Sequence, residues 1–170
     1  LKTVDDVEAF ARSGYTFYTI DPGDAVNDRA GELSDAELEM TVHGLPWAAL
    51  EDSPGDLERR YLGTSLDLGA GSLTVQREEL WRAAAKYGTA VAHTAVMYRH
   101  ILERVGEGRF DLEVSVDETA SPTSPFEHLY IARELRRLGV RWVSLAPRFV
   151  GAFEKGVDYI GDLNAFDAEL

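Results

Sequence analysis

The sequence predicts an α/β fold with a parallel sheet. Three short segments rich in apolar and β-branched residues alternate with amphipathic helical segments, which is the pattern of consecutive βα units. The two closest predicted strands begin about thirty residues apart, the usual length of a βαβ repeat. A length of 170 residues suits one α/β domain spanning residues 1–170, and it is short for a complete barrel of eight βα units, which needs about 200 to 250 residues.

The chain opens with a predicted helix and a predicted strand. Thr3 is a suitable N-cap for a helix over residues 3–13, because its side chain can accept a hydrogen bond from the first turn, and Gly14 ends that helix. Residues 15–20, with the sequence YTFYTI, have the aromatic and β-branched composition of a strand. The turn sequence DPG at residues 21–23 ends this strand.

Residues 25–76 form an irregular insertion in the βα pattern, because prolines and glycines interrupt this stretch repeatedly. Within it, SDAELEM at residues 34–40 has the capping pattern of a short helix. Residues 62–75 predict a hairpin with Gly-Ala-Gly at its tip. A long insertion on a compact scaffold often lies near a functional site.

The second half of the chain carries the clearest βα pattern. Apolar residues recur at spacings of three and four over residues 77–105, which predicts one long helix. Strict alternation over residues 110–116 predicts a strand with one apolar and one polar face. A helix over residues 125–138, with Pro at its start, and a strand over residues 141–146 follow. Residues 157–170 begin another helical pattern.

Composition excludes several classes of function. A net charge of −13 repels phosphate backbones and anionic lipids, which argues against nucleic-acid and membrane partners. The absence of Cys removes disulfides, thiolate nucleophiles and Cys-based zinc sites. No apolar run approaches the roughly 18 residues of a membrane span, and no signal sequence opens the chain, so a cytoplasmic location is expected. The HExxH, GxGxxG, P-loop and GxSxG motifs are also absent.

Charged side chains follow all three predicted strands, at the edge where parallel α/β proteins bind their ligands. Asp21 follows the first strand, Asp117 and Glu118 follow the second, and Arg148 and Lys155 follow the third. Asp and Glu are poor strand residues, so their placement needs a reason. The adjacent pair after the second strand favours a functional role, whereas the single carboxylate after the first can equally cap a turn.

The four histidines give one candidate metal ligand. His93 and His100 lie two helical turns apart on a face of the long helix that also carries packing positions, which favours a structural role. His128 lies one turn into the helix after the second strand, from where it could reach the strand ends as a ligand. A hydrogen-bonded helical histidine is the alternative there. His43 has no informative context.

Two stretches of sequence are distinctive. They are VDETASPTSPFEHLYIA at residues 116–132 and VSLAPRFVGAFEKGVDYIGD at residues 143–162. With IDPGDAVNDRA at residues 20–30 and the helix AAAKYGTAVAHTAVMYRHI at residues 83–101, they resemble the tagaturonate/fructuronate epimerase family. Members of that family are considerably longer, and this chain opens on Leu1, so the resemblance implies a central segment of a longer enzyme.

The resemblance implies a metal-dependent sugar-acid epimerase of hexuronate catabolism on a TIM-barrel-like scaffold. The expected fold is therefore part of a barrel, with a divalent metal cation as cofactor and a small sugar acid as ligand; homo-oligomerisation stays open. Sheet edges left unpaired by a partial barrel need cover from the insertion, a second copy or further chain.

The implied substrates constrain the chemistry. Tagaturonate and fructuronate differ at a carbinol carbon one position beyond the carbon next to their ketone, so neither ketone nor carboxylate acidifies the hydrogen on that carbon. A retro-aldol cleavage followed by an aldol addition to the other face of the aldehyde solves this problem. A divalent metal would polarise the ketone and hold the enediolate. Arg148 or Lys155 would hold the substrate carboxylate.

The retro-aldol chemistry also suggests roles for the carboxylate and histidine candidates. We expect Asp21 and Glu118 to transfer protons, and Asp117 or His128 to lie near the metal. Two alternatives stay open, and the first fits the polar strand ends equally well. One is another metal-dependent sugar isomerase or aldolase, and the other is a noncatalytic carbohydrate-binding segment.

Overall fold

Three parallel strands and two long helices form the centre of the fold. The computed structural model describes residues 1–67, 72–153, 156 and 158–169. The strands of the main sheet are β1 (Phe17–Ile20), β4 (Asp111–Val116) and β5 (Ser144–Pro147). A separate antiparallel pair consists of β2 (Ser65–Asp67) and β3 (Ser72–Thr74). The α-helices are α1 (Val4–Arg12), α2 (Asp35–His43), α3 (Trp47–Leu50), α4 (Pro54–Tyr61), α5 (Arg77–Val105), α6 (Pro125–Arg137) and α7 (Leu163–Glu169).

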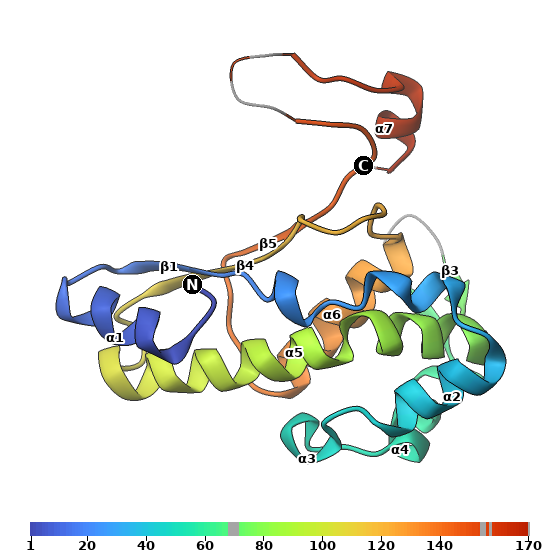
Figure 1. The fold of residues 1–170 in the computed structure, drawn as a ribbon, viewed down its shortest axis with the longest axis horizontal. Helices are drawn as coiled ribbons and strands as arrows, with labels where there is room; N and C mark the ends of the chain where they lie inside the picture. Colours follow the sequence, from blue (N-terminus) through green and yellow to red (C-terminus); the bar gives the residue numbers. More distant parts are fainter. Residues whose placement is uncertain (68–71, 154–155, 157, 170) are drawn as a thin grey trace.

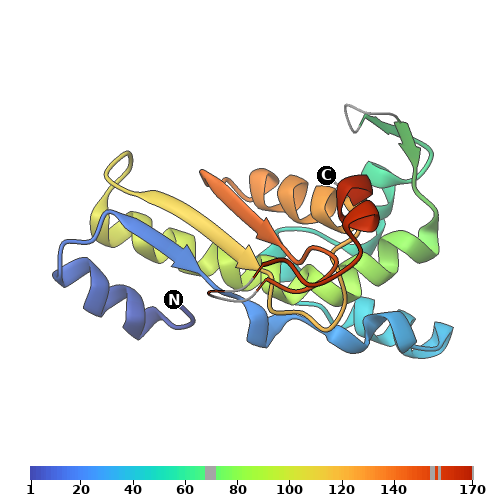
Figure 2. The same cartoon turned by 90° about the horizontal axis from the view of Figure 1, so that it is seen from above.

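The main sheet has the order β1–β4–β5, with β4 in the middle. Tyr18 pairs with Leu112 between the first two strands, and Val114 pairs with Leu145 between the last two. Both pairings are parallel, and Figure 2 shows the three arrows side by side and pointing the same way. The predicted α/β class with a parallel sheet is therefore confirmed.

Two strands begin later than the sequence indicated. The first strand starts at Phe17 rather than at residue 15, because the Tyr15 ring packs on Phe10 of α1, with 5.1 Å between ring centroids. The third strand starts at Ser144 rather than at residue 141. Arg141 instead lies at the surface in an ion pair with Glu107, with 2.6 Å between Nη1 and Oε1.

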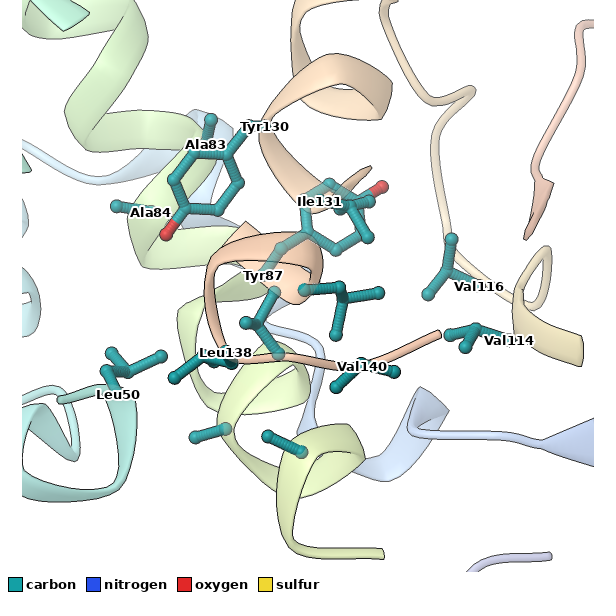
Figure 3. Packing of buried hydrophobic residues seen from close by; sticks show 14 of the residues in the cluster. Leu50, Ala83, Ala84, Tyr87, Val114, Val116, Tyr130, Ile131, Leu138 and Val140 are labelled. Atoms are coloured by element: carbon teal, nitrogen blue, oxygen red, sulfur yellow. The ribbon is translucent and has the colours of Figure 1, made fainter. Parts of the chain in front are cut away.

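One face of the sheet carries the hydrophobic core. The apolar side chains of β4 are buried at alternate positions, as predicted, and α5 and α6 cover them (Figure 1). Figure 3 shows Tyr87 of α5, Ile131 of α6 and Val114 of β4 in the same cluster. Burying a side chain of this size contributes about 1.5 to 3 kcal/mol relative to leaving it exposed. This packing fixes the position of the strand ends relative to α5.

Helix caps set the boundaries of the helices. Thr3 and Ser124 cap α1 and α6, each in a reciprocal capping box with the third helical residue. The predicted long helix is confirmed at Arg77–Val105. Its interior Gly88 has a packing role, because a Cβ there would lie 2.8 Å from Leu45 Cδ1.

The stretch over residues 25–76 contains three α-helices as well as turns. Helices α2, α3 and α4 pack against α5, and the 3-10 helices η1 (Gly23–Ala25) and η2 (Asp28–Glu32) precede them. Ser34 caps α2 in the predicted capping box with Glu37. The predicted hairpin is formed by β2 and β3, while the Gly-Ala-Gly tip lies outside the described residues.

The other face of the sheet is polar. Thr19, Glu113 and Ser144 lie side by side across the three strands, and Thr19 Oγ1 donates to Glu113 Oε1 at 3.1 Å. In the part of the chain that the structure describes, α7 and residues 148–153 and 158–162 lie on this side, beyond the carboxyl ends of the strands (Figures 1 and 2). Phe149 packs against Phe166 of α7, with ring centroids 5.8 Å apart.

Among the described residues, no helix combines the length and the apolar character required for a membrane span.

Candidate functional site

A pocket lies at the carboxyl ends of β4 and β5. Its volume is about 400 Å³. The pocket is lined by Asp117, Ala146, Pro147, Arg148, Phe149, Gly151, Ala152 and Phe153. The two charged residues among them belong to the set that the sequence singled out. We refer to this space as the strand-end pocket.

Asp117 and Arg148 both line the strand-end pocket because of the sheet register. Val116 and Pro147 are paired neighbours in adjacent parallel strands, so the residues that follow them emerge side by side. Asp117 is exposed, and its carboxylate accepts a hydrogen bond from Ser115 Oγ. A carboxylate beside a guanidinium can hold a hydroxylated anion: the cation attracts the ligand carboxylate, and the anion accepts from a hydroxyl.

Arg148 has a free donor in this arrangement. Its side chain is half-buried, and within the described residues its buried Nε has no hydrogen-bond partner. An unsatisfied buried donor costs about 1 to 3 kcal/mol, and a bound acceptor would recover that cost. The positive charge of Arg148 in the pocket lining favours an anionic ligand.

Unlike Asp117, the carboxylates Glu118 and Asp21 do not line the strand-end pocket. Glu118 is exposed on the loop after β4, next to Asp117 in the chain but outside the lining of the strand-end pocket. Asp21 Oδ1 accepts from Gly23 N at 2.9 Å, and its Oδ2 lies 3.4 Å from Lys2 Nζ. Asp21 therefore caps the turn after β1, which was the alternative role expected from the sequence. Its catalytic role stays a prediction.

His128 and Lys155 are the two remaining candidates from the sequence. His128 is half-buried on α6, and burial lowers the pKa of its imidazole, which favours the neutral form that binds metals. It is not among the residues that line the pocket. Lys155 lies outside the described residues.

Comparison with known proteins identifies the family. A model of the family described as "UxaE: tagaturonate epimerase" matches residues 1–170. The chain belongs to the tagaturonate epimerase family. It is 36% identical over 170 residues to a protein of Thermotoga maritima named tagaturonate/fructuronate epimerase. That alignment covers 100% of this chain and 34% of the relative, so the chain spans about a third of its length.

Solved structures of a fructuronate-tagaturonate epimerase have the same fold in the matched region. They are crystal structures of the fructuronate-tagaturonate epimerase UxaE from Cohnella laeviribosi, at 30% sequence identity. A glycerol complex superposes with a TM-score of 0.87 and the native form with 0.86. Each match covers 99% of this chain and 34% of the longer one.

The metal expected for a tagaturonate epimerase was tested against the donors present. Among residues 1–67, 72–153, 156 and 158–169, no group of three or more His, Asp or Glu side chains is arranged to hold a metal ion. We expected Asp117 or His128 near the metal; neither belongs to such a group in the described part of the chain, and a ligand role for either stays a prediction. The described residues do not fit a complete metal site, and we derive no reaction step through one.

Sequence reasoning missed the residues behind the loop after β4. Lys86 of α5 has a side chain that is only 6% exposed and lies 3.1 Å from Glu127 of α6. The signal was available in the sequence AAAKYG, where a lysine occupies the apolar face of the long helix. Lysine is almost never fully buried without a partner, so this placement marks a built interaction.

Proposed function

We propose that this chain is the segment of a tagaturonate/fructuronate epimerase that binds the substrate carboxylate and supplies one proton-transfer group. The observation that carries the proposal is the strand-end pocket, where Asp117 and Arg148 lie together in a chain of this family. The relatives' names supply the substrate class, a ketohexuronate. Arg148 provides a donor for the carboxylate of such a ligand.

The proposal includes a barrel in the complete protein. Parallel sheets are stable when both faces are covered, and here α5 and α6 cover one face while the opposite face carries Thr19 and Glu113. A wall with helices outside and polar side chains inside is what a (β/α)8 barrel needs around a hydroxylated ligand. The remaining strands would come from the other two-thirds of the protein.

The proposed chemistry is a retro-aldol cleavage and aldol re-addition. A base takes the proton of the carbinol hydroxyl, its oxygen becomes an aldehyde as the adjacent C–C bond breaks, and that bond's electron pair passes to the ketone fragment as an enediolate. The aldehyde then turns over, the same bond re-forms on its other face, and the proton returns to the new alkoxide. Asp117 and Glu118 are our candidates for this proton transfer.

The metal and the setting of the reaction stay predictions about the complete protein. We propose a divalent cation whose ligands come mainly from chain outside the described residues, consistent with the incomplete donor set found here. A cytoplasmic location in hexuronate catabolism, with a small sugar acid as the partner, follows from the same family proposal.

Turnover of tagaturonate by the full-length protein tests the function. Product can be followed by NMR, with a panel of ketouronates to identify other isomerase or aldolase activities. Glu118→Gln removes the base without changing side-chain volume and should lower kcat by about 100-fold or more. Glu103→Gln, at an exposed position of α5, is the matched control and should leave kcat unchanged.

Two results would count against this proposal. Wild-type protein that forms no fructuronate from tagaturonate would contradict the function itself. Near-normal turnover by Glu118→Gln would remove Glu118 from the mechanism and leave Asp117 as the remaining carboxylate of the pair.

A further inference from the structure

The loop after β4 carries the proposed proton-transfer groups and is held by distant residues. We call residues 117–124 the β4 loop. Its Thr119 and Thr123 side chains are buried, although Asp117 and Glu118 are exposed. Thr119 Oγ1 donates to the Ser121 carbonyl at 2.8 Å, which closes the loop on itself. A loop that carries exposed reactive groups needs such internal and external support to hold them in one geometry.

Lys86 of α5 supports the β4 loop from outside. Its residue exposure is 5%, and its Nζ donates to Ser121 Oγ at 3.1 Å. The same Nζ lies 3.1 Å from Glu127 Oε1 and 4.9 Å from the centre of the Tyr87 ring. Burial alone lowers the pKa of Lys86, but its neighbours Tyr87 and Glu127 outweigh that effect and raise it, so the side chain carries its charge.

Glu127 extends the contact to the end of the β4 loop. While its Oε1 faces Lys86, its Oε2 accepts from Ser124 N at 2.7 Å. Lys86 therefore reaches the loop in two ways, directly at Ser121 and through Glu127 at Ser124. Removing the ammonium group would leave Glu127 without its cation in a site where the carboxylate is only 17% exposed.

Tyr87, the next residue of α5, supports the pocket from the same side. Its hydroxyl lies 3.3 Å from Thr123 Oγ1, and Thr123 Oγ1 accepts from Arg148 N at 3.1 Å. Thr123 N donates in turn to the Arg148 carbonyl at 2.8 Å. Figure 3 shows Tyr87 rising from α5 into the cluster between α6 and β4. Thr123 is therefore the link between the β4 loop and the residue that we propose for the substrate carboxylate.

We propose that Lys86 and Tyr87 are positioning residues that hold the β4 loop and Arg148 in the geometry required for catalysis. This inference rests on the proposed function. Neither residue lines the strand-end pocket, and both are buried under the β4 loop, whereas Glu118 is exposed on it. Both act through the β4 loop: Lys86 through Ser121, and Tyr87 through Thr123.

A purely structural role is the competing explanation, and it predicts something different. If Lys86 only stabilised the contact between α5 and α6, its loss would lower the melting temperature and leave kcat and the loop unchanged. If it positions the β4 loop, its loss should lower kcat in a folded enzyme. A substitution far from the reacting atoms that displaces the reacting groups by about 1 Å can lower the rate about 100-fold.

The test uses the full-length enzyme with Lys86→Met and Tyr87→Phe. Each should lower kcat for tagaturonate by about 10- to 100-fold and, for Lys86→Met, change KM by less than about threefold. Arg99→Met is the matched control, because Arg99 is a cation of the same helix whose ion pair with Glu51 lies away from the loop. Its kcat should stay within about twofold of wild type.

Amide hydrogen exchange gives a readout that does not need activity. The Thr123 amide is bonded to Arg148 O, and the Ala120 amide donates to Asp28 Oδ1 at 2.9 Å. Both amides should exchange at least about tenfold faster in Lys86→Met than in wild type, and at the wild-type rate in Arg99→Met. Thr123→Ser, which keeps the hydroxyl, should retain kcat better than Thr123→Val, which removes it.

The outcomes separate this inference from the proposed function. If wild-type enzyme converts tagaturonate and a folded Lys86→Met keeps kcat within twofold with unchanged exchange, the positioning role is wrong. If Lys86→Met does not fold, Tyr87→Phe and the two Thr123 variants decide in the same way. If wild-type enzyme converts neither ketouronate, the proposed function is wrong, and unchanged loop exchange in Lys86→Met or Tyr87→Phe would still overturn the positioning role.

Discussion

Replacing Glu134 with Gln removes one charge from a buried ion network between α4 and α6. The Glu134 carboxylate is 4% exposed, and it accepts from Arg137 Nε at 2.8 Å and from Arg60 Nη2 at 3.2 Å. It also accepts from the hydroxyl of Tyr61 at 2.9 Å. Both arginines also lie close to the carboxylate of Asp52, which is 3% exposed. Two carboxylates and two guanidinium groups thus balance each other in a region of low exposure.

The expected loss follows from the burial of the groups left behind. Removing one partner of a fully buried pair costs about 3 to 5 kcal/mol, because an uncompensated charge remains. Here Arg60 is 30% exposed and Arg137 is 24% exposed, so water recovers part of that cost. Gln also keeps an acceptor for Tyr61. We therefore expect Glu134→Gln to lower the free energy of unfolding by about 2 to 3 kcal/mol.

Urea denaturation followed by circular dichroism measures this loss. Glu107→Gln is the matched control, since Glu107 is 67% exposed and pairs with Arg141, which is 78% exposed. The control should change the free energy of unfolding by less than about 0.5 kcal/mol. Equal decreases in the free energy of unfolding of Glu134→Gln and Glu107→Gln, with the same dependence on urea concentration as wild type, would contradict this expectation. Burial of the ion network would then not determine its contribution to stability.

Two further predictions concern acid stability and helix capping. Burial raises the pKa of Asp52, but hydrogen bonds from Arg60 and Ser53 and the nearby arginine charges outweigh it, so the pKa lies below the usual 3.8. Because the pKa of Asp52 is lower in the folded than in the unfolded state, the charged carboxylate stabilises the fold at pH values above its unfolded-state pKa. This stability is lost as the pH falls through the folded-state pKa, so the free energy of unfolding should decrease below about pH 4. Asp52→Asn, titrated from pH 7 to pH 3, should have a smaller drop. Ser124→Ala removes the oxygen that accepts from Glu127 N at 3.2 Å and should cost about 1 kcal/mol in urea denaturation; no loss would show that the cap of α6 is dispensable.

Local signals explain why much of the fold was predictable. The long helix was recovered at Arg77–Val105 because its apolar spacing persists over many turns. The caps at Thr3 and Ser124 were readable because each depends on residues three positions apart. Strand starts were less predictable, since Tyr15 has strand composition and yet packs on Phe10 of the preceding helix. That competition depends on tertiary contacts rather than on propensity.

In the candidate site, the sequence allowed only those residues to be placed whose positions follow from the geometry of a parallel sheet. Parallel strands bring their carboxyl ends to one edge, so Asp117 and Arg148 could be placed together from the sequence. Asp21 follows the same rule, but Lys2 and the turn at Gly23 engage its carboxylate. The burial of Lys86 could be read from its apolar neighbours in the helix, but its partner could not, because Ser121 lies 35 residues away and nothing local specifies that contact.

The position of the strand-end pocket limits what this segment can do by itself. In the proposed retro-aldol route, the C–C bond breaks on one face of the aldehyde carbon and re-forms on the other. This route therefore needs proton-transfer groups on both faces of the aldehyde. Asp117 and Arg148 approach from one wall, formed by the ends of β4 and β5. In the described chain the sheet ends at β1 and β5, whose outer edges offer backbone groups to further strands. In the proposed mechanism the opposing group would therefore come from the part of the longer relatives that this chain does not cover, and the segment itself would bind and orient the substrate.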